Sequence, residues 1–85
     1  MMQSVRVYTT DSCGYCVQAK NLLKKRQITF EEINVQNDHD KRAWLVKVTG
    51  RRTVPQIFIG DDPIGGSDEL HAMDKSGELA KRLNG

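Results

Sequence analysis

Residues 9–16 have the sequence Thr-Thr-Asp-Ser-Cys-Gly-Tyr-Cys and contain both cysteines of the chain. The apolar run before them, residues 5–8, predicts a strand, and residues 17–26 predict a helix. Cys13 therefore lies where a helix begins, and the free backbone N–H groups and the helix dipole there favour a thiolate, the reactive form of cysteine. Cys16 follows about one turn later on the same side, close enough to form a disulfide after a small adjustment. The segment predicts a redox-active dithiol.

Length and composition exclude several classes of protein. We expect a single domain, residues 1–85. Two cysteines are too few for a secreted disulfide scaffold, and C-x-x-C beside a strand–helix unit indicates a catalytic site in a reducing compartment. No signal sequence or membrane-spanning run is apparent, so we expect a cytoplasmic protein. Thirteen Lys and Arg are interspersed with eleven Asp and Glu. This balance favours a small acidic ligand over a nucleic acid. We also expect a monomer with no membrane partner.

The predicted elements define an α/β fold. Their order is strand, helix, strand, helix, hairpin, helix, which implies a four-stranded mixed sheet with helices on both faces. The expected strands are residues 4–9, 28–34, 56–59 and a hairpin partner beginning at 63–64. The expected helices are residues 17–26, a helix from 37–40 to about 48, one that begins near 67–69 and is broken by Gly77, and a short last helix at about 79–83.

Apolar spacing predicts which side chains fill the core. On the first helix these are Cys16, Ala19, Leu22 and Leu23, whereas Lys20 and the later cations fall on the other side or at the helix end. On the second helix the apolar stripe is Trp44, Leu45 and Val48, and Gly50 is expected to end that helix. Phe30 and Ile33 are expected in the core beside the second strand, and His39 and His71 on the surface, because neither fits a metal-ligand spacing with the cysteines.

Three blocks in this order resemble the glutaredoxin family over nearly the whole chain: Cys13-Gly14-Tyr15-Cys16, Thr53-Val54-Pro55 and Gly65-Gly66-Ser67-Asp68. The length and residues 51–59 are most similar to the small bacterial class. The resemblance implies a thioredoxin fold and a thiol–disulfide oxidoreductase that reduces glutathione mixed disulfides and protein disulfides with glutathione.

The resemblance also implies a role for each site residue. Cys13 would be the nucleophile and Cys16 the resolving thiol, although a buried free cysteine is also an ordinary small core residue. Pro55 would follow a cis peptide bond, and the backbone of Val54 would pair with extended glutathione. The N–H groups of Ser67 and Asp68 would bind the γ-glutamyl carboxylate. The expected glutathione-binding residues are Cys13, Tyr15, Arg42, Arg52, Thr53, Val54, Pro55, Gly66, Ser67 and Asp68, with Arg51 a further candidate for the glycine carboxylate.

Two positions depart from the family pattern. Gly14 stands where proline is commonest, and Thr10 stands where many members have lysine, which should leave the Cys13 thiolate less stabilised. A small residue at position 14 also raises an alternative, a dimer that holds a [2Fe–2S] cluster through Cys13 of each chain and two glutathiones. A third possibility is a thioredoxin-like electron donor reduced by a flavoprotein, which the glycine loop and the arginines disfavour. No other metal site is expected.

Overall fold

The structure is a computed structural model, and it describes residues 3–84. Across these residues four strands and four helices follow one another in the predicted order. The elements are β1 (Val5–Thr9), α1 (Gly14–Lys25), β2 (Glu31–Asn34), α2 (His39–Thr49), β3 (Gln56–Ile59), β4 (Asp62–Gly65), α3 (Ser67–Ser76) and α4 (Glu78–Asn84).

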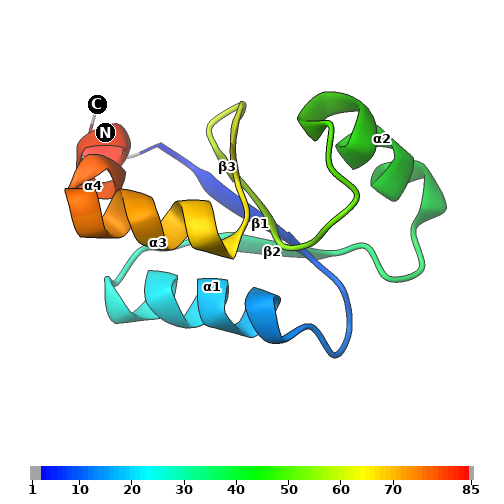
Figure 1. Cartoon of the computed structure of the whole chain (residues 1–85), viewed down its shortest axis with the longest axis horizontal. Coiled ribbons are helices and arrows are strands. Elements are labelled where there is room, and N and C mark those ends of the chain that lie inside the picture. Colours follow the sequence, from blue (N-terminus) through cyan, green and yellow to red (C-terminus); the bar gives the residue numbers. More distant parts are fainter. Residues whose placement is uncertain (1–2, 85) are drawn as a thin grey trace.

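The strands form one mixed sheet in the order β2-β1-β3-β4. β1 is parallel to β2 and antiparallel to β3, and β3 is antiparallel to β4, with an irregularity between Ile57 and Phe58. In Figure 1, α1, α3 and α4 lie together, well separated from α2. The Gln3 N–H donates to the Leu83 carbonyl at 3.1 Å, so the segment before β1 lies beside α4. The predicted sheet with helices on both faces is confirmed.

Alternation along the strands divides the core into two parts. Val5 and Val7 of β1 pack on one face with the inner stripes of α1, α3 and α4, including Leu23 and Leu70, both fully buried. Tyr8 points to the opposite face, toward α2. Burial of each such large apolar side chain contributes about 1.5–3 kcal/mol. The predicted inner stripe of α1 is confirmed, because Cys16, Ala19, Leu22 and Leu23 are all buried.

The ends of α1 differ from the sequence-based expectation. The helix begins at Gly14 rather than at residue 17, because the Cys13 side chain caps it. The expected second strand begins at Glu31 rather than at Ile28. Gln27 takes a left-handed conformation with φ 58°, and the Ile28 N–H donates to the Leu23 carbonyl at 2.9 Å, so these residues close the helix instead of extending the sheet.

The glycines predicted to end two helices do so. Gly50 follows α2 with φ 72° and donates to the Val46 carbonyl, and Gly77 follows α3 with φ 85°. Both values lie in the left-handed region that favours glycine. At the other end of α2 the Asp38 carboxylate accepts a hydrogen bond from the Lys41 N–H at 3.0 Å, as expected for an N-cap.

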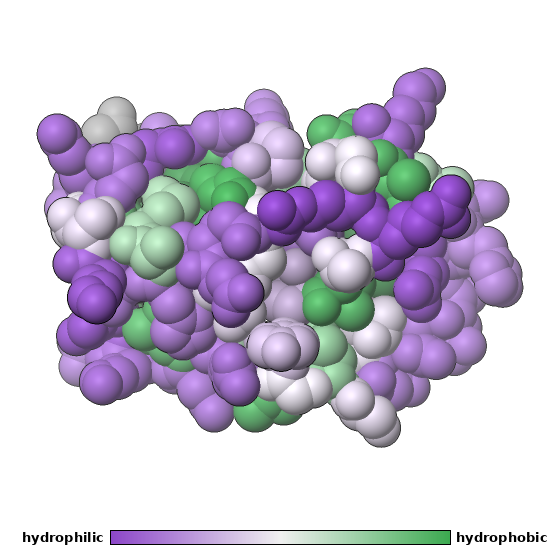
Figure 2. Space-filling view, viewed as in Figure 1, coloured by the Kyte–Doolittle hydropathy of each residue, from purple (hydrophilic) through white to green (hydrophobic). Residues whose placement is uncertain are grey.

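The predicted apolar stripe of α2 is wrong in two of its three members. Only Leu45 is buried, whereas Trp44 is 40% exposed and Val48 42% exposed. The Trp44 ring instead stacks on Phe58 of β3, with centroids 5.7 Å apart, and lies tilted against Tyr8 of β1 at the same centroid distance. Of the predicted strand residues, Phe30 and Ile33 are only partly buried against the core. The face shown in Figure 2 is mostly hydrophilic, with small separate hydrophobic areas.

Candidate active site

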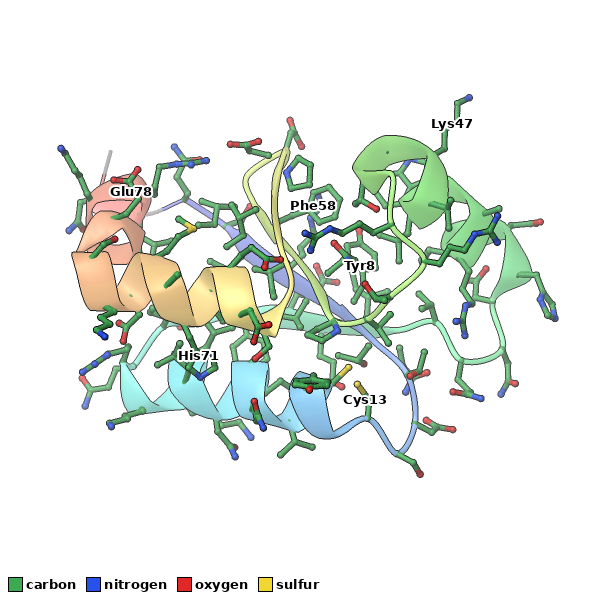
Figure 3. The ribbon with its side chains drawn as sticks, viewed as in Figure 1. Tyr8, Cys13, Lys47, Phe58, His71 and Glu78 are labelled. Carbon is green, nitrogen blue, oxygen red and sulfur yellow. The ribbon has the colours of Figure 1, made fainter. Side chains whose placement is uncertain are left out.

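Cys13 occupies the N-cap position of α1. Its φ and ψ are −106° and 109°, and its sulfur accepts a hydrogen bond from the Cys16 N–H at 3.2 Å, in place of the usual capping oxygen. The side chain is partly exposed, and Figure 3 shows it at the start of α1, beneath the loop that leads into β3. A sulfur held at the positive end of a helix dipole by a backbone donor is placed to be stabilised as a thiolate.

Cys16 has the opposite environment. It is 2% exposed, and burial raises the pKa of its thiol to about 12, with the hydrogen bond to Cys13 contributing in the same direction. A thiol with this pKa remains protonated at neutral pH. The two cysteines therefore divide into an accessible sulfur and a buried one, as the sequence predicts.

A groove of about 350 Å³ runs beside Cys13. The Cys13 thiol lies 3.8 Å from the Val54 carbonyl oxygen, which borders this groove. The groove is lined by Tyr15, Arg51, Thr53, Val54, Pro55, Gly66, Ser67, Asp68 and Glu69. The structure thus brings the three sequence blocks together, and the Val54–Pro55 peptide bond is cis as expected.

The double glycine in the groove permits close packing of backbone. Gly65 has φ 115°, and a Cβ there would lie 2.5 Å from Glu69 Oε1. A Cβ on Gly66 would lie 3.2 Å from the Pro55 carbonyl oxygen. Any larger residue at position 65 would therefore displace the Glu69 side chain and would be strained at this φ. At position 66 the Pro55 carbonyl leaves little room for a side chain.

The first turn of α3 differs in detail from the sequence-based expectation. Gly66 is the N-cap and Ser67 the first helical residue, so the N–H groups of Ser67 and Asp68 lie at the helix N-terminus. The Ser67 side chain is buried, and its hydroxyl lies 3.3 Å from His71 Nδ1, whereas Asp68 is exposed.

Glu69 is the groove residue that sequence reasoning missed. One of its carboxylate oxygens accepts hydrogen bonds from the Gly66 N–H, at 2.8 Å, and from the Arg51 guanidinium. The Gly66 hydrogen bond and then Arg51 lower the pKa of the Glu69 carboxyl. Arg51 is thus engaged with protein, which weakens its candidacy for a ligand carboxylate. An acid three residues after an N-cap is the local signal that could have identified Glu69.

Some of the remaining predicted residues line the groove, and others lie next to it. Arg42 and Arg52 border a small adjoining hollow, with Thr53 and Val54 between that hollow and the groove. Tyr15 is 61% exposed and lines the groove. His39 and His71 are exposed, as predicted, and no group of three or more His, Cys, Asp or Glu in residues 3–84 is placed to hold a metal ion.

A four-stranded mixed sheet with a dithiol at the start of its first helix defines a thioredoxin-fold protein of the thiol–disulfide oxidoreductase class. The chain belongs to the glutaredoxin family. The family model described as glutaredoxin matches residues 5–64.

The similarity to known proteins extends over nearly the full chain. A Pseudomonas aeruginosa glutaredoxin is 44% identical, over 98% of this chain and 99% of its own length. Glutaredoxin 3 of Escherichia coli K12 is 44% identical, over 92% of this chain and 94% of its own. Among solved structures, a buckwheat glutaredoxin–glutathione complex has a TM-score of 0.88 at 32% identity, covering 96% of this chain and 77% of the buckwheat chain. The Brucella melitensis glutaredoxin has a TM-score of 0.86 at 40% identity, covering 96% and 89%.

Proposed function

We propose that this protein is a glutathione-dependent thiol–disulfide oxidoreductase that reduces glutathione mixed disulfides and protein disulfides. The observation that carries the proposal is the partly exposed Cys13 sulfur, 3.8 Å from the carbonyl oxygen of Val54, a residue that lines the 350 Å³ groove. The buckwheat relative, described as a complex with glutathione, supports the same ligand. A reducing compartment such as the cytoplasm suits this chemistry. No helix within residues 3–84 has the length and apolar character needed to span a membrane.

Cys13 is the nucleophile. Its thiolate attacks the glutathione sulfur of a mixed disulfide, forms a new S–S bond to glutathione and releases the substrate as a thiolate that takes a proton from water. A second glutathione thiolate then attacks this mixed disulfide, so glutathione disulfide leaves and Cys13 is reduced again. With a protein disulfide, the first bond is to the substrate and Cys16 resolves it by forming a disulfide with Cys13.

Glutathione lies extended in the groove in this proposal. Its backbone pairs with Val54 in the manner of an added strand. Its γ-glutamyl carboxylate meets the N–H groups of Ser67 and Asp68 at the start of α3, where the helix dipole favours an anion. Its glycine carboxylate lies toward Arg42 and Arg52, which border the hollow beyond Thr53. Tyr15, Pro55 and Gly66 form the walls.

Turnover of a glutathionylated peptide with glutathione tests the proposal. Cys13→Ser should abolish turnover, whereas Cys16→Ser should retain it, because only one thiol is needed for this substrate. Arg52→Gln should raise KM about 3- to 20-fold, the range expected for loss of a charge-assisted hydrogen bond that is partly exposed. Lys47→Gln is the matched control, since Lys47 is an exposed cation on α2 that points away from the groove (Figure 3). Turnover that survives Cys13→Ser would refute the proposal.

A [2Fe–2S] cluster is the second candidate function. Gly14 is exposed, and a Cβ there would meet no atom within 4 Å, so the space in front of Cys13 is open to a second chain. Within the described part of one chain Cys13 is the accessible thiol, so a four-thiolate set would need Cys13 of two chains and two glutathiones. Colourless protein after anaerobic reconstitution with iron, sulfide and glutathione would dismiss this candidate.

The third possibility, a thioredoxin-like electron donor, stays a prediction. It can be tested by finding which reductant the oxidised protein accepts. Oxidised protein that is reduced by a flavoprotein reductase and not by glutathione would favour that reading over the proposed function.

A further inference from the structure

A second hollow opens on the other side of the cysteines from the groove. Its volume is about 460 Å³, and it is bordered by both Cys13 and Cys16. Three charged side chains also border it: Asp11 from the loop after β1, Lys20 from α1 and Glu32 from β2. The proposed function uses none of these residues. The three charged side chains therefore border the same hollow as the otherwise buried Cys16.

Lys20 is held in place from the neighbouring strand. Its ammonium nitrogen lies 3.2 and 3.1 Å from the two carboxylate oxygens of Glu32. The hydroxyl of the buried Thr9 donates to the same carboxylate at 2.9 Å. Burial raises the pKa of Glu32, but the hydrogen bonds from Thr9 and Lys20 outweigh it, and the pKa is lowered. Glu32 is therefore ionised at neutral pH, and Lys20 is a fixed cation rather than a mobile one.

Lys20 stands four residues after Cys16 and borders the same hollow, so the expectation that it lies on the other side of α1 from Cys16 is wrong. Burial is the largest influence on the Cys16 thiol and raises its pKa; a hydrogen bond with the Thr10 backbone lowers the pKa, and the charge of Lys20 lowers it by a smaller amount. Asp11 faces the same hollow, but its carboxylate accepts a hydrogen bond from the Asn34 amide at 2.9 Å. Besides Cys16 itself, the titratable groups that border the hollow within the described chain are Cys13, Asp11, Lys20 and Glu32.

We propose that Lys20 is a positioning residue for the resolving step, in which it stabilises the Cys16 thiolate electrostatically, and that Glu32 limits this effect by pairing with Lys20. The inference rests on the proposed function in one respect, that Cys13 carries a mixed disulfide. In that step the Cys16 thiol gives its proton to water in the hollow. The thiolate attacks the Cys13 sulfur, the Cys13–Cys16 bond forms, and the bond to glutathione breaks. Glutathione leaves as a thiolate and is protonated by solvent.

The two members of the ion pair should act in opposite directions. Lys20→Met removes the cation and keeps an apolar stem of similar length, so the pKa of Cys16 should rise by about one unit. The thiolate fraction then falls about tenfold, while the greater nucleophilicity of the more basic thiolate recovers about threefold, so closure should be about threefold slower. Glu32→Gln leaves Lys20 unneutralised and still accepts from Thr9, so closure should be about threefold faster.

The experiment measures release of glutathione after reduced protein is mixed with glutathione disulfide, across a range of pH. Lys20→Arg should restore the parent rate, and Lys25→Met is the matched control, an exposed cation at the far end of the same helix. Opposite shifts for Lys20→Met and Glu32→Gln support the inference. Shifts in the same direction, or rates within the scatter of the Lys25→Met control, overturn it, because a merely structural ion pair would give those results.

A titration separates this inference from the proposed function. In a Cys13→Ser background, the ultraviolet absorbance of the single Cys16 thiolate reports its pKa without glutathione. Lys20→Met should raise that pKa and Glu32→Gln should lower it. If Cys13 never accepts glutathione, the proposed function fails, and this titration alone decides whether Lys20 acts on Cys16.

Discussion

Glu69 joins the two segments that contain Arg51 and Gly66 and that form the groove. The loss of stability on its removal can be worked out from these two contacts. Its hydrogen bond to the Gly66 N–H is charge-assisted and caps α3, and such a bond contributes about 1–1.5 kcal/mol. Its ion pair with Arg51 is half-exposed, with side chains 39% and 49% accessible, so it contributes only about 0.5 kcal/mol. Glu69→Ala should therefore cost about 1.5–2 kcal/mol in the free energy of unfolding.

Chemical denaturation of three variants separates these contributions. Arg51→Ala should cost about 0.5 kcal/mol, because the Gly66 hydrogen bond remains. Glu69→Gln should cost about 1 kcal/mol, since the amide oxygen still accepts from Gly66 but without a charge. For a domain of this size, a loss of about 2 kcal/mol lowers Tm by roughly 8–16 °C.

The pH dependence gives an independent check. The folded-state pKa of Glu69 is lowered, first by the Gly66 hydrogen bond and then by Arg51. Its contribution is therefore present above the ordinary glutamate pKa and is lost as the pH falls through the lowered folded-state value. Glu69→Gln should remove this part of the acid destabilisation. The reasoning is refuted if Arg51→Ala destabilises as much as Glu69→Ala, or if the acid limb is unchanged in Glu69→Gln.

Three further predictions concern the two thiols and Trp44. Iodoacetamide at neutral pH should modify Cys13 alone in the folded protein, because burial raises the pKa of Cys16 to about 12. Mass spectrometry before and after denaturation checks this. Modification of both cysteines before denaturation would contradict it. Raising the pH above about 9 should then destabilise the fold, since an unfolded Cys16 releases its proton while the folded one retains it. Trp44→Ala should cost about 1–2 kcal/mol, less than the roughly 2–5 kcal/mol for the fully buried Leu23→Ala, because Trp44 is 40% exposed and packs on Tyr8 and Phe58 with only part of its surface. Equal losses in a denaturation series would show that Trp44 contributes as much as a core residue.

Local chemistry was enough to predict most of what the backbone does. Glycine is favoured where a helix ends in a left-handed residue, and this placed the ends of α2 and α3 at Gly50 and Gly77. A 3.6-residue apolar period predicted the buried stripe of α1, including Cys16. The same rule failed for Trp44 and Val48, because only a narrow part of α2 meets the sheet, and the width of that contact is set by the packing of other elements.

The sequence by itself determined the order of the elements and the contrast between the two cysteines, because both depend on neighbours within a few residues. Only the tertiary structure decided which charges meet. Glu69 pairs with Arg51 across 18 positions, and Lys20 with Glu32 across 12, once β2 pairs with β1 and the loop before β3 reaches α3. Charged side chains carry no periodic signal that fixes a distant partner, so their pairing follows from the register of the sheet and the placement of the helices rather than from local sequence.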